Sequence, residues 1–149
     1  MADPDEPEVL LVEDNPGDVR LVEEAFESVG VDTDLSVVRD GEAALAFLFR
    51  RGEYADAPRP NLVLLDLNLP RRDGMTVLDE LKDDPDLRRV PVVVLTGSEA
   101  PEDVAGCYER HAAAYLTKPV DPQGFVALVE SLADFWFSLA RLPPTPDDK

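Results

Sequence analysis

Five polar side chains follow apolar runs at widely spaced points in the chain. They are two neighbouring carboxylates, a third carboxylate, a hydroxyl and an ammonium: Glu13 and Asp14, Asp66, Thr96, and Lys118. Three carboxylates held close together repel one another unless a cation neutralises them, and oxygen ligands suit a hard cation such as magnesium. A lysine and a threonine supply the positive charge and the donor that phosphoryl oxygens require. If the fold brings the five together, they predict a magnesium-dependent phosphoryl site with Asp66 as the candidate nucleophile.

The surroundings of Asp66 set a requirement on the fold. This residue interrupts an apolar run of leucine and valine, residues 62–67, which is typical of a strand buried on both faces. A carboxylate is costly to bury inside such a strand, so Asp66 is expected at its carboxyl end, where ligands bind in open α/β sheets. The alternative is that Asp66 caps a turn, that Glu13 and Asp14 cap a helix, and that Lys118 is a surface lysine.

Short apolar runs and helical patterns alternate along the chain. Five strands are predicted, at residues 9–12, 35–38, 62–67, 90–95 and 113–116. Helices are predicted after each of them, because apolar residues recur there at helical spacing. This alternation indicates an α/β fold, a five-stranded parallel sheet with helices on both faces, in which all strands end at one edge. We expect a disordered acidic lead-in at 1–8, a single domain at 9–141 and a tail at 142–149.

Helix ends carry recognisable signals. Asn15 before Pro16 and Asp121 before Pro122 are each an N-cap followed by proline at the first helical position, and Gly30 is placed to end the first helix. The weakest helix, 101–110, has a predicted apolar face of only Val104, Ala105 and Tyr108. The last helix has a broad stripe of apolar residues, consisting of Phe125, Leu128, Leu132, Phe135 and Leu139, widened by Val129, Trp136 and Phe137.

The broad stripe of the last helix predicts an interface, because exposed aromatic patches usually mark one. We expect a homodimer through the fourth helix, the fifth strand and the fifth helix. The alternative is that Trp136 folds back onto its own core.

Composition excludes several classes of function. The 149 residues carry a net charge of −18, which argues against nucleic acid and anionic membranes as partners. No apolar run has the length of a membrane span and no secretory signal opens the chain, so a cytoplasmic location is expected. The lone Cys107 and lone His111 exclude an intrachain disulfide and leave little for Cys or His metal sites. The few lysines and many acids favour adaptation to high salt, as in halophilic proteins.

The motifs together resemble the receiver domain of two-component response regulators, over about residues 8–142. The stretches that carry the resemblance are LLVEDNP, LLDLNLPRRDG, VVVLTGS and YLTKPVD, in this order. Within the family, the sequence is most similar to stand-alone regulators that partner bacterial phytochromes and related sensor histidine kinases. The features of that closer match are VEDNPGD, the long 52–60 link, DPDLRRVPVVVLT and the FW…LP ending. The resemblance implies the flavodoxin-like (βα)5 receiver fold.

The resemblance also implies a role for each matching residue. Asp66 would accept a phosphoryl group from a kinase phosphohistidine, Lys118 would pair with the phosphoryl oxygens, and Thr96 would hydrogen-bond them. Mg²⁺ would be held by Asp14, Asp66 and the backbone carbonyl of Asn68, with Glu13 assisting through water. Tyr115 would be the switch aromatic that moves with Thr96, although it could be a plain core tyrosine. The Lys118–Pro119 peptide bond would be cis, as is usual in this family.

These roles predict a signalling switch, not a conventional enzyme: the protein would catalyse only its own phosphorylation and dephosphorylation at Asp66. A phosphoryl group adds negative charge and acceptors, which can shift the Thr96 and Lys118 loops and change a protein-interaction surface. The alternative is a receiver fold used as a constitutive interaction module without phosphate turnover. A phosphatase or phosphotransferase on a related fold is less favoured, because Asn68 stands where such enzymes commonly use a second Asp. His111 as a relay phosphohistidine is less favoured still.

Overall fold

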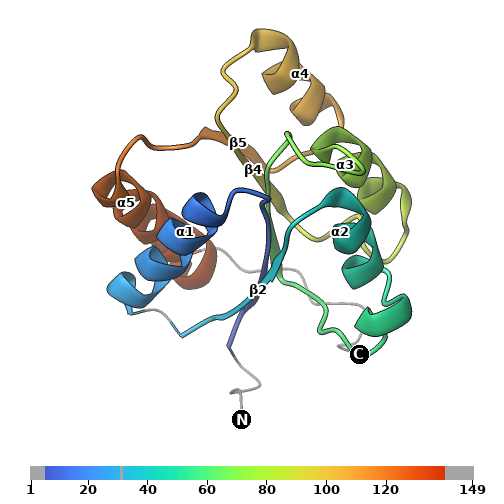
Figure 1. Cartoon of the computed structure of the whole chain (residues 1–149), viewed down its shortest axis with the longest axis horizontal. Coiled ribbons are helices and arrows are strands. Elements are labelled where there is room, and N and C mark those ends of the chain that lie inside the picture. The colour runs from blue at the N-terminus through green and yellow to red at the C-terminus, as the bar shows by residue number, and fades with distance from the viewer. Residues whose placement is uncertain (1–5, 31, 140–149) are drawn as a thin grey trace.

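Five parallel strands form one sheet in the order β2-β1-β3-β4-β5, with helices on both faces (Figure 1). The structure is a computed structural model, and it describes residues 6–30 and 32–139. The strands are β1 (Glu8–Val12), β2 (Asp34–Val38), β3 (Leu62–Leu65), β4 (Val92–Thr96) and β5 (Ala114–Thr117). The α-helices are α1 (Pro16–Val29), α2 (Gly41–Leu48), α3 (Gly74–Asp83), α4 (Pro101–Glu109) and α5 (Pro122–Leu132). The predicted sheet and its helical layers are therefore confirmed.

The sheet separates two hydrophobic cores, because alternate residues of a strand point to opposite faces. In β3, Leu62 and Leu64 point to the face covered by α1 and α5, while Val63 and Leu65 point to the face of α2, α3 and α4. All four side chains are at most 1% exposed. Because both faces are covered, a charged side chain has no place within β3, and Asp66 comes immediately after its last residue.

The predicted helix signals are confirmed. The Asn15 side chain accepts hydrogen bonds from the backbone N–H groups of Gly17 and Asp18, at 2.9 and 3.1 Å. Asp121 caps α5 in the same way through the N–H of Gly124, at 2.7 Å. Gly30 ends α1 with φ = 74°, a left-handed conformation that costs glycine nothing. The two N-caps therefore fix where the chain turns from β1 into α1 and from β5 into α5.

Two expectations around α4 and β5 were wrong. The buried residues of α4 are Gly106 and Cys107, whereas Ala105 and Tyr108 are exposed, so the predicted apolar face is incorrect. Small residues form the true face because α4 packs closely on α3, where Cys107 Sγ lies 3.9 Å from Met75 Sδ. The Lys118–Pro119 peptide bond is trans, since the described residues contain no cis peptide bond. Trans is the preferred form even before proline.

The last helix also differs from its predicted pattern. The α-helix ends at Leu132 and continues as a π-helix over Ala133–Leu139. Val129 is fully buried in the core and does not widen an exposed stripe. Trp136 and Phe137 are partly buried against the α1/α5 core, and Phe135 is instead the exposed aromatic, at 53%. The wider turn of the π-helix rotates Phe135 away from the sheet.

The two ends of the chain are described only in part. Glu8 already belongs to β1, so the strand begins inside the predicted lead-in. Residues 1–5 and the tail at 142–149 lie outside the described residues, and the predictions for them stay predictions. Within residues 6–30 and 32–139, no helix is both long and apolar enough to cross a membrane.

Candidate functional site

The five polar residues meet at the carboxyl edge of four neighbouring strands. Glu13 and Asp14 follow β1, and Asp66 follows β3. Thr96 is the last residue of β4, and Lys118 follows β5. The strands are parallel and adjacent, so residues far apart in the sequence lie side by side at this edge. The predicted convergence is confirmed.

Lys118 lies at the centre of the site. Its Nζ is 2.7 Å from Oε2 of Glu13, 2.9 Å from Oδ2 of Asp66 and 2.8 Å from Oδ2 of Asp18. The side chains of Glu13 and Asp66 are only 3% and 4% exposed, and that of Lys118 is 15% exposed. Burial acts to lower the pKa of Lys118, but the hydrogen bonds to the three carboxylates outweigh it and raise this pKa above its ordinary value. The ammonium is therefore fully charged at neutral pH.

The carboxylates at this edge fit a divalent cation. Oxygens of Glu13, Asp14 and Asp66 lie within 4.8 Å of one another. Burial raises the pKa of Glu13 from 4.5 to about 7, and the negative charge of Asp66 adds to this, while Lys118 opposes it. Glu13 is thus held where its charged form is disfavoured unless more positive charge is present. Carboxylate oxygens without sulfur or imidazole are the donor set of magnesium or manganese.

The side-chain hydroxyl of Thr96 is buried and has no hydrogen-bond partner among the described residues. The residue is fully buried, and its Oγ1 makes no hydrogen bond to any described residue. An unpaired buried hydroxyl costs about 1–3 kcal/mol, so native proteins rarely keep one without a reason. Thr96 ends β4, the strand next to β3, and its backbone carbonyl accepts the N–H of Lys118 at 2.8 Å. Its hydroxyl is therefore an unpaired donor at the edge of the sheet that holds Asp66 and Lys118.

The loop after β3 fixes Asp66 through backbone contacts. Oδ1 of Asp66 accepts a hydrogen bond from the N–H of Asn68 at 3.2 Å. Asp73 caps α3, and the N–H of Gly74 donates to Leu67 O at 2.9 Å. A Cβ at Gly74 would lie 2.4 Å from Asp66 O. Glycine is therefore required here so that α3 can begin directly against the backbone of Asp66.

Tyr115 connects β5 to the loop that follows Thr96. Its hydroxyl donates to Ser98 O at 2.9 Å, and its own N–H donates to the hydroxyl of Tyr108 at 3.1 Å. Its side chain is partly buried and packs against the core on the face of α2, α3 and α4, so the switch role and the alternative of a plain core tyrosine both stay predictions. A movement of the 97–100 loop would break the bond to Ser98, which makes Tyr115 sensitive to the position of that loop.

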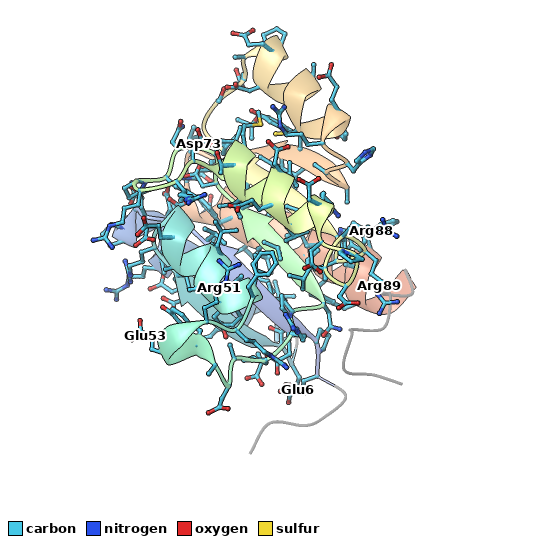
Figure 2. The ribbon with its side chains drawn as sticks, turned by 90° about the vertical axis from the view of Figure 1, so that its right-hand side faces the viewer. Glu6, Arg51, Glu53, Asp73, Arg88 and Arg89 are labelled. Carbon is cyan, nitrogen blue, oxygen red and sulfur yellow. The ribbon has the colours of Figure 1, made fainter. Side chains whose placement is uncertain are left out.

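Sequence reasoning missed Asp18, the third carboxylate on Lys118. An acid in the first turn of a helix is ordinarily explained by the helix dipole, and nothing in the local pattern links this residue to position 118. His111, in contrast, precedes β5 and lies at the opposite edge of the sheet. Arg88 and Arg89 project from the loop after α3, at the other end of that helix from Asp73 (Figure 2). They therefore lie outside the site.

The comparison with protein families decides the identity of this arrangement. The family model described as the response regulator receiver domain matches residues 9–130, which include every residue of the site. The chain belongs to the response regulator receiver family. It is a receiver of two-component signalling, and its sheet is the flavodoxin-like receiver fold.

Similar proteins agree with this assignment over nearly their whole length. The receiver is 49% identical to the response regulator Rcp1 of Synechocystis over 135 residues, covering 91% of this chain and 92% of Rcp1. The Mn²⁺-bound form of Rcp1 superposes with a TM-score of 0.87, at 48% identity, over 93% of this chain and 99% of that one. The phosphorylated cyanobacterial phytochrome response regulator RcpA gives 0.89, at 45% identity and the same coverage.

Proposed function

We propose that this receiver accepts a phosphoryl group on Asp66 from a sensor histidine kinase, in a magnesium-dependent reaction, and that the group switches a protein-interaction surface. The single observation that carries the proposal is the unpaired, fully buried hydroxyl of Thr96 at the edge that holds Asp66 and Lys118. A phosphoryl group on Asp66 supplies the acceptor that this hydroxyl lacks. The phosphorylated state described for RcpA, 45% identical, supports the same chemistry.

The chain's own residues account for the reaction. An oxygen of Asp66 forms a bond to phosphorus, the bond from phosphorus to the imidazole nitrogen of the kinase breaks, and the electron pair stays on that nitrogen. Lys118, already 2.9 Å from Asp66, neutralises charge on the transferred oxygens. The N–H of Asn68, 3.2 Å from Oδ1, holds the carboxylate in one orientation.

The cation would be held by Asp14, Asp66 and the backbone carbonyl of Asn68, with Glu13 assisting through water. When bound, it supplies positive charge that stabilises the phosphoryl oxygens in transfer. The cluster of carboxylate oxygens within 4.8 Å supports this assignment. The Mn²⁺-bound form of Rcp1 adds support, because Mn²⁺ is another divalent cation that prefers oxygen ligands.

The switch would act through Thr96 and Tyr115. A hydrogen bond from Thr96 to the phosphoryl group draws in the loop that begins at Gly97. The hydroxyl of Tyr115 is bonded to Ser98 O in that loop, so the tyrosine must find a new position when the loop moves. Tyr115 lies on β5 beside α4, and its movement would change the α4–β5 surface.

Docking of the kinase would use the same edge of the sheet. Val120, two residues after Lys118, is completely exposed at 101%. A fully exposed valine in the loop that carries Lys118 offers a partner protein an apolar contact at the edge of the sheet that holds Asp66. A Val120→Asp variant should accept phosphoryl groups from acetyl phosphate normally but slowly from a kinase.

A homodimer is proposed through α4, β5 and α5. β5 is an edge strand, and beside it lies a groove of about 460 Å³ lined mainly by apolar residues. The lining includes Leu116, Leu128 and Trp136, and the exposed Ala127 lies at its side. An Ala127→Glu variant should be monomeric by light scattering. Ala55→Glu, at an exposed position in the connection after α2, is the matched control and should behave as the wild type.

The test of phosphoryl acceptance is the intact mass after incubation with acetyl phosphate, with and without Mg²⁺. The wild type should gain one phosphoryl group only when Mg²⁺ is present, and Asp66→Asn should gain none. Asp83→Asn makes the same chemical change at the exposed last residue of α3 and should react normally. If the wild type formed no adduct while an active receiver did, and beryllofluoride also failed to bind, the constitutive interaction module would replace this proposal.

A further inference from the structure

Lys118 has no hydrogen-bonding capacity left over. A protonated lysine has three N–H donors, and three carboxylates accept them at 2.7, 2.8 and 2.9 Å. Two of the acceptors, Glu13 and Asp66, were expected at this edge of the sheet. The third, Asp18, comes from the first turn of α1 and is separated from Lys118 by 100 positions in the sequence.

The three acceptors are not equivalent. Glu13 and Asp66 also belong to the group of oxygens that fits a divalent cation, and Asp66 is the residue to be phosphorylated. These two carboxylates therefore have a second partner during the reaction. Asp18 does not belong to that group, so its contact with the lysine is not shared with the cation.

The position of Asp18 is itself well fixed. Its backbone N–H donates to Oδ1 of the N-cap Asn15 at 3.1 Å, and the next residue, Val19, is buried in the core. A carboxylate in the first turn is also favoured by the positive end of the helix dipole. Lys118, by contrast, carries its charge on a flexible four-carbon stem. A rigid acceptor can therefore hold the mobile donor in place.

We propose that Asp18 is the positioning residue that keeps the ammonium of Lys118 directed at Asp66 while phosphoryl transfer takes place. The inference rests on the proposed function of Asp66 as acceptor. Asp18 acts only through Lys118 and does not touch the phosphoryl group. Without it, the lysine stem rotates freely whenever Glu13 and Asp66 are engaged elsewhere, and the charge is misplaced at the moment when it is needed.

The first measurement tests the positioning directly and does not depend on phosphorylation. The chain has only three lysines, Lys82, Lys118 and Lys149, so the ¹³Cε signals of a lysine-labelled full-length protein are few enough to assign. Order parameters are measured with saturating Mg²⁺ in the wild type and in Asp18→Asn. Lys82, whose Nζ is held by the carbonyls of Arg88 and Val90 at 2.7 and 2.9 Å, is the internal reference.

The second measurement is the rate of adduct formation with acetyl phosphate at saturating Mg²⁺ in the same proteins. Glu23→Gln removes one negative charge from an exposed position on the same helix and is the matched control. We expect Lys118 to become mobile in Asp18→Asn, with Lys82 unchanged. The rate should fall about tenfold or more, because a misplacement of about 1 Å can slow a reaction by about 100-fold. Glu23→Gln should match the wild type in both measurements.

Two results would overturn the role of Asp18. One is an ordered Lys118 in Asp18→Asn, and the other is a mobile Lys118 with an unchanged rate. An equal loss of rate in Glu23→Gln would also refute it, because net charge alone would then be the cause. A wild type that forms no adduct would instead refute the proposed function. The two failures can be told apart. If the wild type reacts and Asp18→Asn reacts equally fast, only the role of Asp18 is refuted and the proposed function stands.

Discussion

Replacing Thr96 by valine should strengthen the resting fold and weaken the phosphorylated one. Valine has nearly the shape of threonine but puts a methyl group where the unpaired, fully buried Oγ1 lies. Leaving a buried hydroxyl unpaired costs about 1–3 kcal/mol, so Thr96→Val should raise the free energy of unfolding by about 1–2 kcal/mol. In a chain of 149 residues this corresponds to a rise in melting temperature of about 3 °C for each kcal/mol.

The opposite effect is expected once a phosphoryl analogue is present. In the wild type the hydroxyl can donate to a fluorine of the negatively charged beryllofluoride bound at Asp66, and a hydrogen bond to a charged group contributes about 1.5–3 kcal/mol. Its loss should weaken beryllofluoride binding about 10- to 150-fold in the presence of Mg²⁺. Thermal unfolding with and without the analogue measures both quantities in one series, because a ligand that binds only the folded state raises its stability.

Two variants control this experiment. Thr96→Ser keeps the hydroxyl and should retain most of the response to beryllofluoride. Thr117→Val makes the same replacement at the exposed register partner on β5 and should change neither quantity appreciably. One hydrogen bond typically contributes about 1 kcal/mol to stability. If Thr96→Val lowered the free energy of unfolding of the resting protein by that amount or more, the hydroxyl would have a hydrogen-bond partner in the resting state. Thr96 would then not be a free donor waiting for a phosphoryl oxygen.

Three further results are expected. Gly74→Ala should lower stability by about 1–3 kcal/mol and slow adduct formation, because its Cβ would lie 2.4 Å from Asp66 O. Denaturant unfolding measures the stability, and the intact mass measures adduct formation. Gly97→Ala is the control and should be nearly neutral, because a Cβ at Gly97 would have open space around it. Burial and the charge of Asp34 raise the pKa of Glu8 from 4.5 to about 7. The folded state therefore binds the proton more tightly, and the free energy of unfolding falls as the pH rises through this window; urea titrations should show that Glu8→Gln removes about 1 kcal/mol of this fall, after allowance for solvent screening. Finally, the net charge of −18 should make the melting temperature rise between 0.1 and 1 M KCl, since the screening length shortens from about 10 to about 3 Å; a flat or falling curve would contradict adaptation to high salt.

The fold could be predicted largely because its signals are local. The four consecutive apolar residues of β3, LVLL, are typical of a parallel strand that is buried on both faces, and all four are buried in the structure. Asn15 and Asp121 are caps whose action depends on residues within one helical turn. Predictions failed where packing between elements decided the outcome. Phe135 has the correct helical spacing for the core but is exposed, because the helix widens after Leu132.

The sequence by itself determined the chemistry available to this receiver: which carboxylates, which hydroxyl and which ammonium end the strands, and therefore that they meet at one edge. Only the tertiary structure decided how those groups share their charges. Asp18 and Lys118 are 100 positions apart and belong to different local patterns, yet their charged atoms lie 2.8 Å from each other. The unpaired Oγ1 of Thr96 is likewise invisible in the sequence. The physical reason is that periodicity and capping act over a few residues, whereas the partner of a buried polar atom is set by the packing of elements distant in the chain.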